Sequence, residues 1–224
     1  MKRMKRLMVI LLAAVLCVSL AACGGGGLTA NDATVYVQGL LDRTYLGQHN
    51  EDYMELVGTD EETMEQYYQD GLYAEAEYFA YYFDLYDPSE ELMDDLVEFY
   101  GQLYKNSKYE VHPASKLSSG GYAVEVVVYP MDLITLMSED YEAVLDDFWG
   151  EYTQEDVDAM TDEEYIALDN QWGYELLDLA YEKLPEVGYE EAVYLTVQVR
   201  QGEDEVWSLV DTDFDAIDAA MIAY

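Results

Sequence analysis

The spacing of apolar residues along this chain changes four times, and this pattern constrains the fold more than any other feature. From residue 31 to residue 103 apolar residues recur every three or four positions, the repeat of one helix face. The spacing becomes two over residues 109–129, helical again over 138–186, and two again over 193–210, before a short final helix. This order predicts an α+β fold in which N-terminal helices pack on a four-stranded antiparallel sheet, with a helical insertion between two hairpins.

Residues of helix-capping type mark where the helices are expected to begin and end. Serine, threonine, aspartate and asparagine accept hydrogen bonds from the free amides of a first turn, glycine suits the residue after a helix, and proline suits its first position. The expected boundary residues are Asn31 or Asp32, Gly47, Thr59 with Glu62, Pro88, and Thr161 with Glu164. They predict three helices before the first hairpin and a further one within the insertion.

The first 23 residues have the pattern of an export signal. Four cations within the first six residues precede 16 uncharged residues, a run shorter than the roughly 20 residues of a membrane-spanning helix. The run ends in Leu20-Ala21-Ala22-Cys23, which resembles the lipobox of bacterial lipoproteins. The resemblance implies cleavage before Cys23 and a diacylglycerol, with fatty acids such as palmitate, on its sulfur. The alternative is an uncleaved signal anchor in which Cys23 is an ordinary small residue.

The lipobox resemblance sets the expected organisation of the chain and its location. Residues 1–22 are a signal peptide, residues 23–30 hold the lipidated cysteine and a glycine-rich tether, and residues 31–224 form a single α+β domain with an acidic helical insertion at 138–186. Cys17 and Cys23 are the only cysteines, so the domain is expected to fold without disulfides. The expected location is the extracytoplasmic side of the cell membrane.

The charge is strongly asymmetric. After residue 6 the chain has six Lys and Arg against 48 Asp and Glu, a net charge of −42. Binding of nucleic acid requires cationic side chains that neutralise phosphates, so we expect no nucleic-acid partner. Divalent cations or a basic partner suit this charge, and simple solvation of an acidic surface is the plainer interpretation.

No residue pattern indicates catalysis, and we expect the protein not to be an enzyme. His49 and His112 are the only histidines, and neither has a nearby serine or cysteine in a nucleophile pattern. Adjacent carboxylates on helices point in different directions and are expected to be solvated rather than to act as acid–base pairs. These adjacent carboxylates are Asp94 with Asp95, Asp146 with Asp147, and Glu163 with Glu164. No cofactor-binding motif is present either.

The residues Asp211, Asp213 and Asp215 match the opening of a calcium-binding EF-hand loop, in which alternate positions supply oxygen ligands. The rest of that pattern fails, because Ala216 replaces the required glycine and Ile222 replaces the bidentate glutamate. Acidic side chains at the start of a helix also interact favourably with its dipole. Helix stabilisation is therefore the favoured interpretation, and these three residues are weak candidates for metal ligands.

Tyrosine is unusually frequent, with 23 tyrosines against five phenylalanines. Many tyrosines fall in the second expected helix: Tyr67, Tyr68, Tyr73, Tyr78, Tyr81, Tyr82 and Tyr86. If exposed, they would form a surface for sugars or peptides, because tyrosine gives a large contact area at low entropic cost. We favour the interpretation that this helix is central and that its rings form the core.

The order of elements resembles the nuclear-transport-factor-like or cystatin-like superfold, in which a curved sheet wraps a long helix into a cone. More narrowly, the segments 45–53, 122–132 and 207–224 resemble uncharacterised lipoproteins of Gram-positive bacteria built on that cone. The chain departs from the usual plan where the early strand pair before the third helix is missing or very short, and where the insertion 138–186 is added. The resemblance covers about half of the chain.

Three functions follow from these observations. The leading hypothesis is a membrane-anchored lipoprotein that binds a protein, peptide or glycan ligand through its sheet face or acidic insertion, without catalysis. The second is a hydrolase or isomerase with a pocket inside the cone, which requires converging titratable groups of shifted pKa. The third is a divalent-cation binder that takes calcium through its acidic residues.

Overall fold

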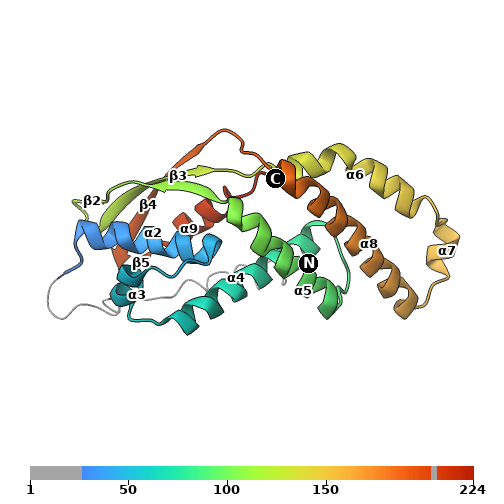
Figure 1. The fold of residues 1–224 in the computed structure, drawn as a ribbon, viewed down its shortest axis with the longest axis horizontal. Coiled ribbons are helices and arrows are strands. Elements are labelled where there is room, and N and C mark those ends of the chain that lie inside the picture. Colours follow the sequence, from blue (N-terminus) through green and yellow to red (C-terminus); the bar gives the residue numbers. More distant parts are fainter. Residues whose placement is uncertain (1–26, 203–205) are drawn as a thin grey trace. The chain divides into compact units, whose positions relative to one another are not determined.

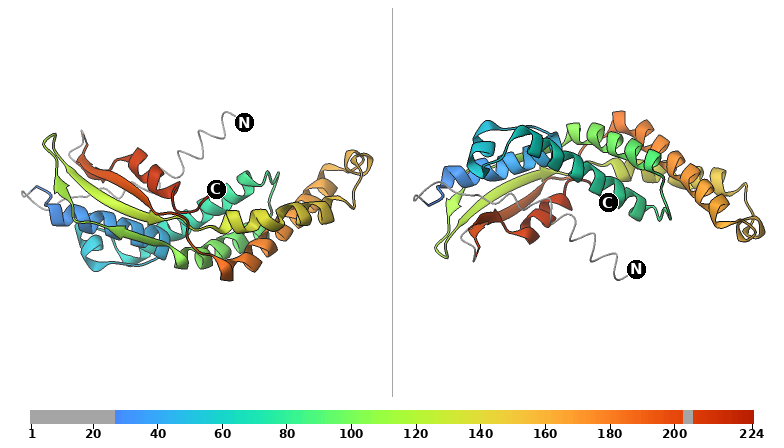
Figure 2. Two further views of the ribbon diagram at one scale, coloured as in Figure 1. Left: turned by 90° about the horizontal axis from the view of Figure 1, so that it is seen from above. Right: turned by 90° about the horizontal axis from the view of Figure 1, so that it is seen from below.

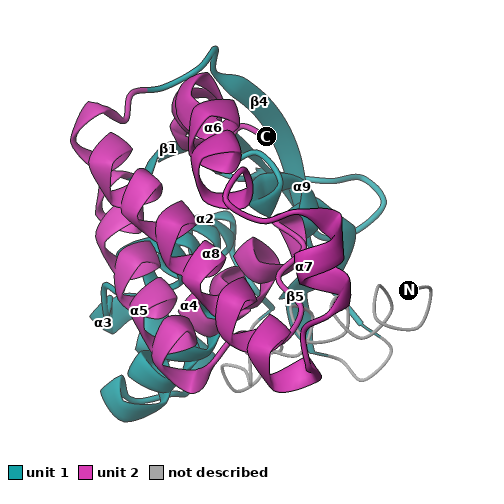
Figure 3. Cartoon of the chain, turned by 90° about the vertical axis from the view of Figure 1, so that its right-hand side faces the viewer, with its two compact units in different colours: residues 1–71, 107–130, 189–221 teal, residues 72–106, 131–188, 222–224 magenta. Residues whose placement is uncertain are grey.

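The computed structural model describes residues 27–202 and 206–224, which form two compact units (Figure 3). Unit 1 holds the described residues up to 71, together with 107–130 and 189–221, and unit 2 holds 72–106, 131–188 and 222–224. Each unit therefore draws on segments from the whole length of the predicted domain 31–224. The predicted signal peptide and Cys23 lie outside the described residues.

Unit 1 contains the predicted antiparallel sheet. Its main path has the order β1 (Lys108–Val111), β3 (Tyr122–Tyr129), β4 (Val193–Gln201) and β5 (Trp207–Leu209), and the two-residue strand β2 (Ser115–Lys116) also pairs with β3. Two antiparallel hairpins are therefore separated by a helical segment, and the α+β fold class is confirmed. The sheet curves along helix α2 (Ala30–Leu46), as Figures 1 and 2 show.

One face of the sheet supplies much of the core of unit 1. Tyr122, Val124, Val126 and Val128 alternate along β3 and are all buried. On β4, Val197 and Val199 are buried as well and pair with Val124 and Tyr122. This alternation is the reason for the two-residue spacing seen in the sequence. Polar contacts join α2 to the sheet: Thr34 Oγ1 accepts the amide of Ala114 at 2.8 Å.

The predicted end of the first helix is confirmed, and its predicted start is wrong by about two residues. Gly47 follows α2 with φ 59°, a left-handed conformation that glycine adopts without strain. At the other end the N-cap is Thr29, not Asn31 or Asp32. Thr29 and Asp32 form a capping box, so Asp32 stabilises the first turn from inside it.

Helix α4 (Glu61–Tyr82) also begins one residue later than its predicted capping box. The amide of Thr59 donates to the carbonyl of Met54 at 3.1 Å, so Thr59 completes the end of helix α3 (Glu51–Val57). Asp60 takes over at the start of α4, where its Oδ1 accepts the amide of Thr63 at 2.9 Å. Hydrogen bonds from the backbone and then from the side chain of Thr63 hold the pKa of Asp60 below its usual range.

Unit 2 is helical and contains the second half of α4. Its other elements are α5 (Glu90–Leu103), the 3₁₀ turn η1 (Tyr104–Asn106), α6 (Leu133–Trp149), α7 (Gln154–Asp158), α8 (Asp162–Lys183) and the 3₁₀ turn η2 (Leu184–Glu186). Helices α6 and α8 run side by side and are joined through α7 (Figure 1). The insertion therefore starts at Leu133, five residues before its predicted start. The predicted capping box of Thr161 and Glu164 is confirmed.

The connection between α4 and α5 is held by two side chains of α8. Asp169 Oδ2 accepts the amide of Tyr86 at 2.8 Å, and Asn170 Oδ1 accepts the amide of Ser89 at 2.6 Å. Ser89 is the N-cap of α5, so the prediction of Pro88 as the first helical residue is wrong. Serine can accept the amide of Leu92, whereas proline offers no such group.

Candidate functional site

A continuous row of nine aromatic rings in unit 2 is the main candidate for a binding surface. Neighbouring rings have centroids between 4.9 and 6.3 Å apart, which is the range of favourable aromatic contacts. In order of contact the rings belong to Tyr78, Tyr224, Tyr82, Phe83, Tyr141, Trp172, Phe148, Trp149 and Tyr152. We call this set the aromatic row.

Most of the aromatic row is open to solvent. Tyr82 and Tyr224 are 44% and 51% exposed, and only Trp172, at 5%, belongs to the buried core. The other six rings are half-buried. Large apolar side chains that gather in one place and stay partly exposed are typical of interaction surfaces, whereas scattered ones carry no such meaning.

The far part of the α6–α7–α8 segment, residues 138–167, carries the end of this row and has no buried residue. The buried residues of α6 are Leu133 and Met137, both in its first two turns. Further along α6, Val144, Leu145, Phe148 and Trp149 are all half-exposed. We call residues 138–167 the distal segment. All of its apolar side chains are at least partly exposed.

The prediction that the tyrosines of the second helix form the core is wrong. None of the seven is buried, and Tyr73, Tyr81, Tyr82 and Tyr86 are between 41% and 72% exposed. Small residues occupy much of the buried stripe instead, which runs over Met64, Leu72, Ala76, Phe79 and Ala80. Ala76 and Ala80, four residues apart on either side of Phe79, were the signal in the sequence that the tyrosines lie on other faces.

The surroundings of the aromatic row are strongly anionic. Unit 2 holds 27 Asp and Glu against two cations, Lys105 and Lys183. Lys183 is 9% exposed and pairs with Asp140, whose hydrogen bond raises the pKa of the lysine. The adjacent carboxylates picked out in the sequence, among them Asp146 with Asp147, are all exposed, as predicted.

Unit 1 contains a second candidate, the buried Tyr45 and the half-buried Tyr109, which both donate to carboxylates. Tyr109 Oη donates to Asp42 Oδ1 at 2.7 Å, and Gln38 Nε2 donates to the same oxygen at 2.7 Å. Burial, the negative charge of Asp42 and this hydrogen bond all raise the pKa of Tyr109, so the phenol stays protonated. The Tyr109 ring lies 6.3 Å from that of Tyr45.

Tyr45 makes the other tyrosine–carboxylate pair. Its hydroxyl lies 3.0 Å from Asp218 Oδ1, at the end of α9 (Asp211–Asp218). Burial raises the pKa of Asp218 to about 6, the hydrogen bond from Tyr45 opposes that shift, and the charge of Asp215 adds to it. Sequence reasoning missed both pairs, because their members lie 67 and 173 residues apart.

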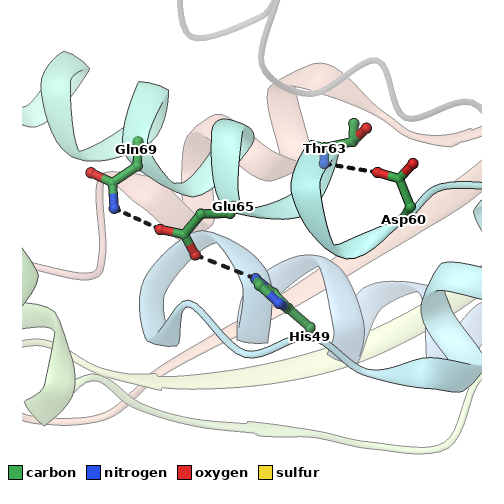
Figure 4. A network of polar contacts seen from close by, with 5 residues as sticks. All are labelled: His49, Asp60, Thr63, Glu65 and Gln69. Carbon is green, nitrogen blue, oxygen red and sulfur yellow. Dashed lines mark hydrogen bonds and ion pairs between the residues drawn. The ribbon is translucent and has the colours of Figure 1, made fainter.

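The two histidines lie in different places of unit 1. His49 Nε2 is 3.6 Å from Glu65 Oε2, and Gln69 Nε2 donates to the other oxygen of that carboxylate at 2.8 Å (Figure 4). His112 lies on the solvent face of the sheet, where its Nδ1 is 3.1 Å from Glu125 Oε1. Among the described residues, the ion pairs of the two histidines are with Glu65, Glu110 and Glu125, and not with members of the tyrosine–carboxylate pairs.

The three candidate metal ligands lie at the start of a helix rather than in a loop. Asp211 and Asp213 fall in the first turn of α9, and Asp213 Oδ2 accepts the amide of Gln198 on β4 at 2.8 Å. Asp215 is exposed as a residue, but partial desolvation of its carboxyl group and the negative charge of Asp211 raise its pKa. Within residues 27–202 and 206–224, no three His, Cys, Asp or Glu side chains are placed to hold a metal ion together.

Comparison with known proteins gives one informative match. No family profile and no curated protein sequence matches this chain. Its fold is similar to the crystal structure of "a putative lipoprotein (ycdA)" from Bacillus subtilis, with 18% identity and a TM-score of 0.58 over 86% of this chain. This chain spans 56% of the Bacillus protein's chain. At that identity the likeness concerns the fold alone.

In the part of the chain that the structure describes, no helix is both long enough and apolar enough to cross a bilayer.

Proposed function

We propose that this protein is a lipid-anchored, extracytoplasmic binding protein that holds a protein, peptide or glycan ligand on the aromatic row and performs no catalysis. One observation carries the proposal: eight of the nine rings in the row remain partly open to solvent although they contact one another. Rigid aromatic rings give a large contact area for a small loss of conformational entropy. A protein that leaves such a surface uncovered has a use for it.

The anchor rests on the residues that precede the domain. Leu20-Ala21-Ala22-Cys23 follows a basic start and a short apolar run, which is the order of a lipoprotein signal. The Bacillus subtilis protein of similar fold is itself described as a lipoprotein, which supports the same location for this chain. Two acyl chains on Cys23 would hold the domain at the membrane, whereas one chain binds only marginally.

The tyrosine–carboxylate pairs support a structural role rather than catalysis. Tyr45 is fully buried, and its hydroxyl and that of Tyr109 both donate to carboxylates of neighbouring elements. These bonds tie α9 and β1 to α2. The pocket enzyme and the calcium-binding protein stay predictions, as does the nuclear-transport-factor-like cone.

Labelling with a fatty acid tests the anchor. Cells that make the protein are fed a fatty acid with an alkyne tag, and the wild-type chain is compared with Cys23→Ser. We expect label in the wild-type chain alone, and release of the variant into the medium. Equal labelling of both chains would contradict the anchor without touching the binding surface.

Binding to arrays of peptides and glycans tests the surface. The full chain is compared with Tyr82→Ala and Trp149→Ala, which shorten the aromatic row. Tyr73→Ala is the matched control, because Tyr73 is an equally exposed tyrosine of α4 that belongs to no ring contact of the row. We expect ligands that lose affinity for the two row variants and keep it for the control. If every ligand found bound the wild-type chain and the three variants with equal affinity, the aromatic row would not be the binding surface.

A further inference from the structure

We propose that the partner of the aromatic row is a basic protein segment, in which lysine or arginine side chains alternate with apolar ones. The inference rests on the proposed function, because it names the chemistry of the ligand for the same surface. The juxtaposition that carries it is a row of mostly partly exposed rings set among carboxylates, with no cation nearby in sequence.

The distal segment is the first step of the argument. Between Ser138 and Ala167 the chain has twelve Asp and Glu, and no Lys, Arg or His. The same segment contributes Tyr141, Phe148, Trp149 and Tyr152 to the row. A ligand seated on these rings would therefore lie in a negative potential, which favours cations and repels anions.

The second step is the chemistry of the rings themselves. Ammonium and guanidinium groups bind the faces of tyrosine and tryptophan, and arginine also stacks on them. Unit 1 already contains three such contacts, made by two cations. Arg43 lies 5.0 Å from the centre of the Tyr67 ring, and Lys108 lies 4.1 Å and 5.2 Å from those of Tyr129 and Tyr189. In the aromatic row, by contrast, no cation–π contact occurs among the described residues.

An exposed carboxylate acts electrostatically on one ring of the row. Glu142 follows Tyr141 on α6. After burial, its negative charge raises the pKa of the Tyr141 hydroxyl, and Tyr82 adds a smaller effect. A cation placed on the Tyr141 ring would therefore also be attracted by the charge of this carboxylate.

Charge also decides between a basic partner and a second copy of this chain. A copy would bring the net charge of −42 that its residues after position 6 carry, and its distal segment has no cation to place against a carboxylate. Like charges brought together at an interface cost free energy rather than supply it. A basic segment gains attraction from the same carboxylates and covers the exposed rings with its apolar side chains.

Three matched peptides test the inference on the full chain held in phosphatidylcholine nanodiscs. All carry leucine and tryptophan at alternate positions, and the other positions are arginine, its uncharged analogue citrulline, or glutamate. Affinity is measured at physiological salt, so that weak long-range attraction is screened. The proteins are wild type, Tyr82→Ala, Trp149→Ala, Tyr82→Phe, which keeps the ring, and the control Tyr73→Ala. Circular dichroism confirms that each variant is folded.

We expect the arginine peptide to bind at least about tenfold more tightly than the citrulline peptide, from cation–π and carboxylate contacts together. Tyr82→Ala and Trp149→Ala should each weaken it several-fold, whereas Tyr82→Phe and Tyr73→Ala should not. If the citrulline or glutamate peptide binds as tightly and still depends on the row, the basic partner is wrong and the binding surface stands. If the arginine peptide binds regardless of the row, charge alone attracts it and the inference is overturned. If no peptide shows row-dependent binding, the inference fails and the proposed binding surface loses its support for peptides.

Discussion

Tyr45 and Asp218 lie 173 residues apart in the chain, and the tyrosine hydroxyl donates to the aspartate at 3.0 Å. The bond joins the last turn of α2 to the end of α9, so it fixes the C-terminal helix of unit 1 against the first helix. It does so at a cost, because the carboxylate is charged at neutral pH in a place that is poorly hydrated. Burial is what raises the pKa of Asp218 to about 6.

The shifted pKa of Asp218 predicts how Asp218→Asn changes the free energy of unfolding with pH. In the unfolded chain this carboxyl titrates near its ordinary value of 3.8, so between about pH 4 and 6 the folded state holds the proton more tightly. Asp218 therefore destabilises the fold progressively as pH rises through this window. We expect the asparagine variant to be more stable than wild type by about 1–3 kcal/mol at pH 7.5, from the cost of a pKa shift of about two units. At pH 4 the difference should vanish.

Chemical denaturation across this pH range measures the effect, and Glu55→Gln is the control. Glu55 is exposed and lies in α3 of the same unit, so its replacement removes one negative charge without altering the buried pair. The control should show little change at either pH. An equal gain in both variants would mean that net charge, rather than the burial of Asp218, sets the pH dependence.

The spacing of apolar residues was sufficient to predict the fold class and most elements. Strand β3 could be located because Val124, Val126 and Val128 alternate with less buried positions. The end of α2 could be located because Gly47 is the residue there that adopts a left-handed backbone conformation without strain. The first residue of each helix was harder to predict, because several residues of capping type lie close together in the sequence. Thr59 and Asp60 could each begin α4, and the choice depended on which of them α3 used to complete its own end.

A close approach at Gly39 predicts the effect of adding one methyl group. A Cβ atom at this position of α2 would lie inside the van der Waals radius of the Tyr53 ring and Cβ. Tyr53 is fully buried and has no room to move, so Gly39→Ala should lower the free energy of unfolding by about 1–3 kcal/mol. Gly71→Ala is the opposite case: it lies within α4 with no atom near the added group, and alanine should stabilise that helix by about 0.5–1 kcal/mol. Thermal unfolding that moved both variants in the same direction would contradict this packing.

The candidate sites were harder to predict than the fold, for physical reasons. Acidic and aromatic residues could be counted in the sequence, but which tyrosines touch one another depends on how helices pack. Tyr82 and Tyr141 belong to helices that are separated by the 50 residues from 83 to 132, and no local pattern indicates that the Phe83 ring lies between theirs. The acidic character of the insertion, by contrast, needed no structure at all.

The connection between α4 and α5 offers a test of a buried carboxylate as a backbone acceptor. Asp169 is 3% exposed, and its carboxylate accepts the amide of Tyr86. Asp169→Ala would leave that amide without its acceptor, which should lower the free energy of unfolding by about 1–3 kcal/mol. Asp178→Ala makes the same change at an exposed position of α8 and should have little effect. Denaturant unfolding of the two variants compares them directly, and equal losses would rule out a special role for Asp169.

Nitration of tyrosines distinguishes the two interpretations of the crowded tyrosines on α4. Tetranitromethane attacks the phenolate of an accessible ring, so both exposure and an ordinary pKa favour the reaction. Tyr82 and Tyr86 are 44% and 72% exposed, whereas Tyr100 is 2% exposed and burial holds its pKa well above the usual value. We therefore expect mass spectrometry of the briefly treated protein to find nitrotyrosine at the first two and none at Tyr100, with all three modified after unfolding in urea. Protection of Tyr82 in the folded protein would return it to the core and would leave the aromatic row without one of its two most exposed rings.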